Sequence, residues 1–303
     1  MSALYRAWDS DLAYSFRRSP VAMISGLVLA VLLMGSMFSS WIAPYDPFDL
    51  ASLNLMDSMV PPVFVADGTA AHLLGTDNQG RDMLSGIMYG MRISVIVGAA
   101  SVAFAVLVGM VFGLLAGYLG GAVDSVLMRV ADVQLSFPAI LIALLIDGVV
   151  TAALPPSMHE QLEIWVLIFA IGVSYWPQFA RTVRGSTLVE RGRDYVMAAR
   201  VIGLSPVRIM LTHILPNVMG PVLVIGTLTL GLAILSEATL SFLGVGLPPT
   251  QPSVGTLIRI GNDFLYSGEW WITIFPGVAL VLMVLSINLL GDWLRDALNP
   301  RLR

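Results

Sequence analysis

The chain has 303 residues, of which 57% are hydrophobic and only 12% are charged. Soluble domains carry about 25% charged residues, so this composition excludes an ordinary water-soluble protein and favours folding in a lipid bilayer. The net charge of −4 and the lack of a dense basic patch argue against a nucleic-acid partner. The chain has no cysteine, and all 16 basic residues are arginine, which excludes disulfides, thiolate chemistry and a P-loop lysine.

A helix needs roughly 20 apolar residues to cross about 30 Å of hydrocarbon, and six segments are candidates, of which the third and fourth are shorter than the others. They are residues 21–41, 93–117, 137–154, 164–180, 218–236 and 272–291. We therefore expect an all-α integral membrane protein with six transmembrane helices. The first segment could be a cleaved signal peptide, but it is long for one and no A-x-A site follows it. We expect it to remain as an anchor after a tail of residues 1–20.

The first external loop, residues 42–92, is long and rich in proline and aspartate. It precedes a transmembrane core, residues 93–291. The loop contains a compact polar element, formed by Gly75, Thr76, Asp77, Gly80, Arg81 and Asp82. This element could contact an external protein or a substrate. Alternatively, it could be a turn in which aspartate side chains bind backbone N–H groups and an Arg–Asp pair closes the structure.

Three glycines on the second span, Gly109, Gly113 and Gly117, repeat every four residues. Such a ladder lets two helices approach closely, either inside the subunit or at a pathway or subunit interface. Asp147 and Glu237 are ionisable residues in or near spans. Because charge inside a membrane is unfavourable, both are candidates for the translocation pathway, with local hydrogen bonding as the alternative.

The arginines are distributed unequally between the two sides of the membrane. Residues 1–20, 118–136, 181–216 and 292–303 share one side and contain 13 arginines. The opposite loops contain Arg81 and Arg259, with Arg92 at a boundary. Because loops rich in arginine stay in the cytoplasm, we expect both termini to be cytoplasmic.

The internal segment 181–216 is too long for a simple connection and has a helical pattern. We expect Asp194 to cap a short helix whose one face carries Tyr195, Val196, Ala199 and Ile202. Small side chains at 198 and 199 would let a partner approach the backbone closely.

Gly203 should end this helix, with Leu204 exposed in the turn. Ser205 and Pro206 should start a second helix, and Pro216 should mark the entry to the fifth span. Such a helix could dock in a groove of another protein or lie on lipid headgroups.

This segment resembles the "EAA" loop of ABC importer permeases, E-A-A-x3-G-x9-I-x-L-P. Ala198, Ala199, Gly203, Leu215 and Pro216 fall at the matching positions, while Met197 replaces the glutamate and His213 the isoleucine. Other pieces look like the C-type subunit of the dipeptide/oligopeptide/nickel permeases. They are 72–77, 80–82, Ser85, Gly90, 92–94, 194–196, 237–244, 270–271, 275–277, 288–292 and 295–298.

The resemblance covers nearly the whole chain and implies the type I ABC importer permease fold. Residues 194–205 would then be the coupling helix that docks in a cleft of a cytoplasmic ATPase. The coupling-loop residues carried over are Asp194, Tyr195, Ala198, Ala199, Arg200, Gly203, Leu204, Ser205 and Pro216.

The resemblance also implies the partners. They would be a second homologous permease, two ATPase subunits that bind ATP and Mg²⁺, and an extracytoplasmic solute-binding protein. The chain itself would hold no cofactor and catalyse no reaction. Its expected place is the bacterial inner membrane, and its expected cargo is di- or oligopeptides.

Three alternatives remain at this point. A proton-coupled secondary transporter would use Glu237 or Asp147, and a related ABC permease would carry nickel complexes or another small solute. An intramembrane enzyme is disfavoured because the chain has no G-x-S-x-G elbow, and His159-Glu160 is not followed by the second histidine of a zinc protease. Three widely spaced histidines offer no metal cluster.

Overall fold

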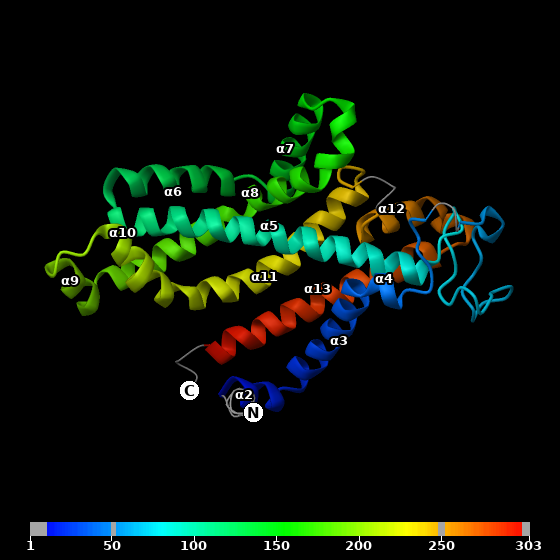
Figure 1. Ribbon diagram of the computed structural model, residues 1–303, viewed down its shortest axis with the longest axis horizontal. Coiled ribbons are helices and arrows are strands. Elements are labelled where there is room, and N and C mark those ends of the chain that lie inside the picture. The colour runs from blue at the N-terminus through cyan, green and yellow to red at the C-terminus, as the bar shows by residue number, and fades with distance from the viewer. Residues whose placement is uncertain (1–10, 50–52, 248–251, 299–303) are drawn as a thin grey trace.

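The computed structural model of the chain describes residues 11–49, 53–247 and 252–298, and this part is mainly helical (Figure 1). The helices are α2 (Asp11–Arg18), α3 (Pro20–Met37), α4 (Ser39–Ile42), α5 (Met83–Leu119), α6 (Gly121–Leu135), α7 (Ala139–Ala153), α8 (Pro156–Arg191), α9 (Asp194–Val201), α10 (Pro206–Ile209), α11 (Leu215–Phe242), α12 (Val254–Phe264) and α13 (Trp271–Leu298). Two 3₁₀ turns, η1 (Leu55–Asp57) and η3 (Leu265–Ser267), and a π-helical turn, η2 (Met210–Ile214), join them.

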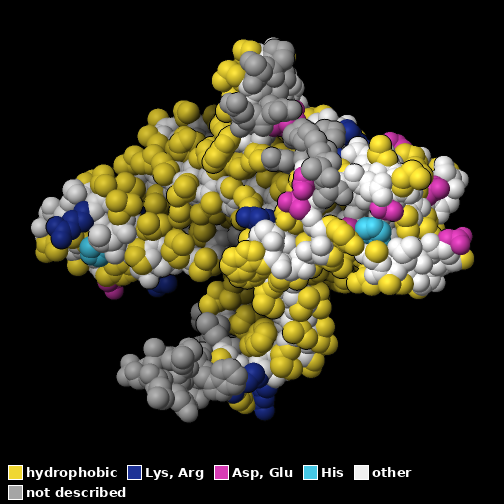
Figure 2. Space-filling model, turned by 45° about the vertical axis from the view of Figure 1, so that its right-hand side comes forward, with side chains coloured by type: hydrophobic (Ala, Val, Ile, Leu, Met, Phe, Trp, Pro, Cys, Tyr) yellow, Lys and Arg dark blue, Asp and Glu magenta, His cyan; other side chains and the backbone are white. Residues whose placement is uncertain are grey.

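Among the described residues, five helical segments are long and apolar enough to cross a membrane, in α3, α5, α8, α10–α11 and α13. A sixth span is present if α6 and α7, which meet at 93°, count as one. Hydrophobic side chains cover most of the face drawn in Figure 2, while acidic and polar groups gather at the end formed by the predicted external loop. The all-α membrane architecture expected from the sequence is therefore confirmed.

The glycine ladder of α5 packs against α8 inside the subunit. A Cβ atom added to the glycine would lie 2.4 Å from Phe179 Cβ at Gly109, 2.6 Å from Val183 Cβ at Gly113, and 2.7 Å from Thr187 Cβ at Gly117. Carbon atoms do not approach so closely, so only glycine permits this spacing between the two helices. The ladder serves internal packing, the first of the two roles that the sequence left open.

The third span differs from the prediction. Residues 118–136 were expected to be a cytoplasmic loop, but most of them form helix α6, which packs against α5 and α8. Its two acidic residues pair with α8: Asp124 Oδ1 and Oδ2 accept from Arg184 at 2.5 and 2.6 Å, and Asp132 lies 3.9 Å from Arg181. Because these pairs neutralise the carboxylates, a segment that contains charges can pack along an apolar bundle. Its charged residues therefore wrongly suggested a loop.

Two predicted boundaries also move. Helix α5 begins at Met83, so the last ten residues of the predicted external loop 42–92 are helical. Helix α8 continues to Arg191, so the first part of segment 181–216 extends the fourth span. The 164–180 span looked short because its helix continues into more polar sequence at both ends.

A side chain of α6 repairs the break that Pro177 makes in α8. Proline has no N–H, so the carbonyl of Val173, four residues earlier, loses its helical donor. The Gln134 amide donates to this carbonyl, and Gln134 Oε1 accepts from Trp176 Nε1 at 2.9 Å. One glutamine therefore satisfies two groups of the neighbouring helix.

We expect Gln134→Leu to lower the free energy of unfolding by about 1–3 kcal/mol, because the Val173 carbonyl and the Trp176 indole would both lose a partner. The measurement is thermal unfolding of the purified chain in detergent. Val133→Leu, at a position of α6 that is 55% exposed, is the matched control and should change little. Equal melting temperatures for Gln134→Leu and the wild type would contradict this role.

The N-terminal helices α2 and α3 pack against the last helix, α13. Phe16 of α2 contacts the Trp293 ring edge-to-face at a centroid distance of 5.2 Å, and Trp293 Nε1 donates to Ser15 at 3.3 Å. Helix α3 packs on α13 and α5. The first apolar segment is thus part of the bundle.

Candidate coupling segment and external cap

Helix α9 forms where the coupling helix was expected, but its start differs. Arg193 is the capping residue, and Asp194 occupies the first helical position without a capping hydrogen bond. The prediction that Asp194 caps the helix is therefore wrong. A carboxylate in the first turn still interacts favourably with the positive end of the helix dipole.

One face of α9 packs against the subunit, while the C-terminal end of the helix is exposed. Val196 and Ala199 are buried against the subunit, and the Arg200 guanidinium lies 5.0 Å from the centre of the Tyr118 ring of α5. At the far end of the helix, Val201 is 87% exposed and Ile202 is 74% exposed. We call these two residues the apolar tip.

This arrangement corrects the sequence prediction in three places. Ile202 does not share the buried face of Val196 and Ala199, and Ala199 contacts the subunit's own core rather than an open surface. Leu204 is only partly exposed and packs against that core. Ala198 remains exposed. The sequence alone could not decide which side of so short a helix faces the bundle.

The turn after α9 is as expected. Gly203 has φ +81°, a conformation that glycine adopts without strain, and it follows the end of the helix. Ser205 caps α10 by accepting from Arg208 N–H, and Pro206 is the first helical residue. Pro216 lies in the first turn of α11. Sequence analysis missed the π-helical turn η2 between α10 and α11, because the local sequence resembles that of an ordinary helix.

Tyr195 joins three elements. Its hydroxyl donates to Glu190 in the last turn of α8 and accepts from Asn217 Nδ2 of α11 at 3.1 Å. Burial, followed by the nearby Glu190 carboxylate, raises the pKa of Tyr195 above its ordinary value. The hydroxyl therefore stays protonated at neutral pH and acts as a donor.

The external polar element is a turn. Gly75 and Gly80 have φ values of +80° and +78°, and Asp77 Oδ1 accepts from the backbone N–H groups of Gln79 and Arg81 at 2.8 and 2.9 Å. The Arg81 guanidinium lies 3.9 Å from the other oxygen of Asp77. Both side chains are buried, so this element favours the turn over a direct contact surface.

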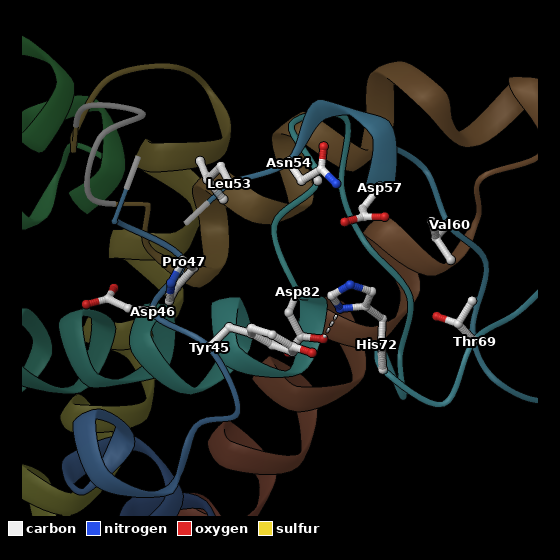
Figure 3. Close-up of a pocket in the computed structure, with 12 residues that line it drawn as sticks. Tyr45, Asp46, Pro47, Leu53, Asn54, Asp57, Val60, Thr69, His72 and Asp82 are labelled. Carbon is white, nitrogen blue, oxygen red and sulfur yellow. Dashed lines mark hydrogen bonds and ion pairs between the residues drawn. The ribbon is translucent and has the colours of Figure 1, made fainter. Parts of the chain in front are cut away.

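Asp82 connects this turn to helix α5. It caps α5 by accepting from Ser85 N–H at 2.9 Å, and its other oxygen lies 3.1 Å from His72 Nδ1 (Figure 3). Thr76 hydroxyl accepts from Val60 N–H, and its carbonyl accepts from Trp271 Nε1 at 3.0 Å. We call the described residues 43–49 and 53–82, which lie in the predicted external loop, the external cap.

The cap encloses a pocket of about 290 Å³. Its lining includes Tyr45, Asp46, Asn54, Asp57, His72 and Asp82 (Figure 3). Among the residues that the structure describes, no group of three His, Cys, Asp or Glu side chains is placed to bind a metal ion.

We expect the stability of the cap to depend on pH through Asp77. Burial raises the pKa of Asp77 above 3.8, against the opposing effects of the two backbone donors and of Arg81. The folded state then holds the proton more tightly than the unfolded state, and this contribution to stability is lost as the pH rises through the folded pKa. Asp77→Asn keeps the acceptor oxygen but does not titrate. Its melting temperature relative to wild type should therefore rise between about pH 4 and pH 7.

Asp77→Ala is the companion variant, since it loses the acceptor and should be less stable by about 1–3 kcal/mol at every pH. A difference between Asp77→Asn and wild type that stays constant across this pH range would contradict the prediction.

The two pathway candidates lie inside the subunit in this structure. Glu237 is fully buried where α11 meets α5 and α12, and its Oε1 accepts from Ser241 at 2.8 Å. Helices α11 and α12 lie very close together at this point. A Cβ atom added to Gly255 of α12 would lie only 2.2 Å from the carbonyl oxygen of Ala238 on α11. Asp147 is 7% exposed on α7. This geometry favours local hydrogen bonding and packing, and a role in the translocation pathway for either residue stays a prediction.

An open groove of about 680 Å³ runs between α11 and α13. Most of its lining is apolar, and its polar members are Asn217 and Arg295. Nothing in the sequence pointed to it, because it depends on how two distant helices diverge.

A family model described as the binding-protein-dependent transport system inner membrane component matches residues 109–303. The chain belongs to this family. A second model, the N-terminal TM domain of oligopeptide transport permease C, matches residues 7–62 of the permease.

Curated relatives cover the permease from end to end. It is 37% identical over 315 residues to the di/tripeptide transport system permease protein DppC of Pseudomonas aeruginosa, covering 100% of this chain and 99% of that protein. It is 39% identical over 304 residues to the dipeptide transport system permease protein DppC of Escherichia coli, covering 100% and 95%.

Among solved structures, the permease resembles a chain of the inward-facing MetNI methionine ABC transporter. The TM-score is 0.55 at 20% sequence identity, over 72% of the permease and 98% of that chain. This likeness supports the type I importer fold. The permease is thus a non-catalytic, multi-pass membrane component of an ABC importer, and ATP hydrolysis belongs to separate subunits. The proton-coupled carrier is not favoured.

Proposed function

We propose that the permease forms half of the translocation pathway for di- or oligopeptides in the bacterial inner membrane. The similarity to permeases named for dipeptides and di/tripeptides, over the full length of the chain, supports this cargo. A second, homologous but non-identical permease supplies the other half. A solute-binding protein delivers the peptide on the side of the external cap.

The observation that carries the coupling role is the apolar tip of α9. A helix anchored to the bundle by Val196 and Ala199 presents Val201 and Ile202 outward, as a helix that docks in a protein groove requires. The segment 194–205 and Pro216 therefore form the docking site for an ATPase. Two ATPase subunits, one on each permease, bind the ATP and Mg²⁺, and this chain holds no cofactor.

The orientation follows the arginine distribution, with both termini in the cytoplasm. In support, the α9–α10 turn and the external cap lie at opposite ends of the molecule, and α13 runs from the side of the cap back toward α2 (Figure 1).

The test is uptake of a labelled dipeptide into liposomes that contain the permease co-purified with its partner permease and ATPases, with the binding protein added outside. Uptake should require ATP and should persist when a protonophore removes the pH gradient. Uptake that collapses with the gradient and ignores ATP would restore the secondary transporter. ATP-driven uptake of Ni²⁺ complexes but not dipeptides would retain the importer and reject the peptide cargo.

A further inference from the structure

At the start of α11 the backbone bonding is irregular and a side chain adds to it. In the π-helical turn η2, Leu215 N–H bonds to the Met210 carbonyl, and Pro216 contributes no N–H at the next position. Asn217 Nδ2 donates to the His213 carbonyl at 2.7 Å and so ties the first turn of α11 to η2. A π-helical turn beside a proline is a place where a helix can change its geometry at low cost.

Asn217 also contacts helix α9 and lines the groove between α11 and α13. Its amide donates to the Tyr195 hydroxyl of α9 at 3.1 Å, and the residue lines the groove between α11 and α13. Tyr195 in turn donates to Glu190 at the end of α8. The chain of contacts Glu190–Tyr195–Asn217 therefore runs from the end of the fourth span, through the docking helix, to the wall of the groove.

We propose that Tyr195 and Asn217 are positioning residues that transmit movement of α9 to the first turn of α11, and thereby set the width of the groove. This inference rests on the proposed docking of α9 on an ATPase. Tyr195 and Asn217 are exposed and Glu190 is partly exposed in the isolated chain, where water weakens hydrogen bonds. A partner docked on α9 excludes that water, so the link is strongest when the ATPase is bound.

The first test uses the permease alone. Because the chain has no cysteine, spin labels can be attached at Met197→Cys on α9 and Leu223→Cys on α11, both at exposed positions. We expect a narrow distance distribution in the otherwise wild-type chain and a broader one after Tyr195→Phe, which removes only the hydroxyl. An unchanged distribution would overturn the proposal, whether or not an ATPase binds.

The second test uses the reconstituted importer and measures peptide transported per ATP hydrolysed. Tyr195→Phe and Asn217→Leu should each lower this ratio by about three- to tenfold, the effect of one lost hydrogen bond. The double variant should lose less than the product of the two single effects, because both act on one link. Independent, multiplying effects would overturn the proposal.

Glu190→Gln is the matched control, since its side-chain carbonyl still accepts from the Tyr195 hydroxyl, and its ratio should stay near that of the wild type. Glu190→Ala should behave like Tyr195→Phe, and equal ratios for the two Glu190 variants would overturn the link. If the wild-type permease recruited no ATPase, the proposed function would be wrong. The spin-label distances would still show whether the Tyr195–Asn217 link holds α9 to α11.

Discussion

Gly109→Ala is expected to lower the melting temperature of the permease and the yield of folded protein. The added Cβ atom would lie 2.4 Å from Phe179 Cβ, 2.9 Å from the Trp176 carbonyl oxygen and 3.0 Å from the Ala180 nitrogen. Two of these three atoms belong to the backbone of α8, which cannot move without separating the helices. Overpacking of this kind destabilises by about 1–3 kcal/mol and sometimes more. The measurement is the fraction of monodisperse protein in detergent, together with its melting temperature.

Gly185→Ala on α8 is the matched control. No heavy atom of another element lies within 4 Å of its added Cβ, so the substitution should be neutral or should stabilise the helix by up to about 1 kcal/mol. If Gly109→Ala and Gly185→Ala behaved alike, the close packing of α5 on α8 would be wrong.

The second large effect is expected at the apolar tip. Val201→Asp should weaken association with the ATPase by about 2–4 kcal/mol, or roughly 30- to 1,000-fold, because docking would bury an unpaired carboxylate. The fold should survive, since Val201 is 87% exposed in the subunit. The measurement is co-purification with the ATPase and, where the complex is isolable, its dissociation constant.

Val201→Leu keeps the apolar character and should retain association. Val207→Asp, on α10 and 59% exposed, tests whether any added charge on this side of the membrane is harmful, and it should have the smaller effect. Normal ATPase recovery with Val201→Asp would show that the docking surface lies elsewhere.

The uncharged spans and the small-residue ladder could be predicted because they depend on composition and spacing within one helix. Helix α6 could not, because Asp124 finds its partner, Arg184, 60 residues later. The early start of α5 depends on the Asp82 cap. For α9 the sequence located the helix and its Gly203 stop but not its orientation, which is decided by contacts such as Arg200 with Tyr118.

The contact between Thr76 and Trp271 has a consequence for biosynthesis. The Thr76 carbonyl lies in the first third of the chain, and its donor on α13 is made 195 residues later. A ribosome delivering the chain into the membrane therefore makes the cap before the Trp271 indole that donates to it exists. The hydrogen bond between Thr76 and Trp271 can form only when the final helix has been inserted. Resistance of this segment to an external protease would then report completed assembly of a single newly made subunit.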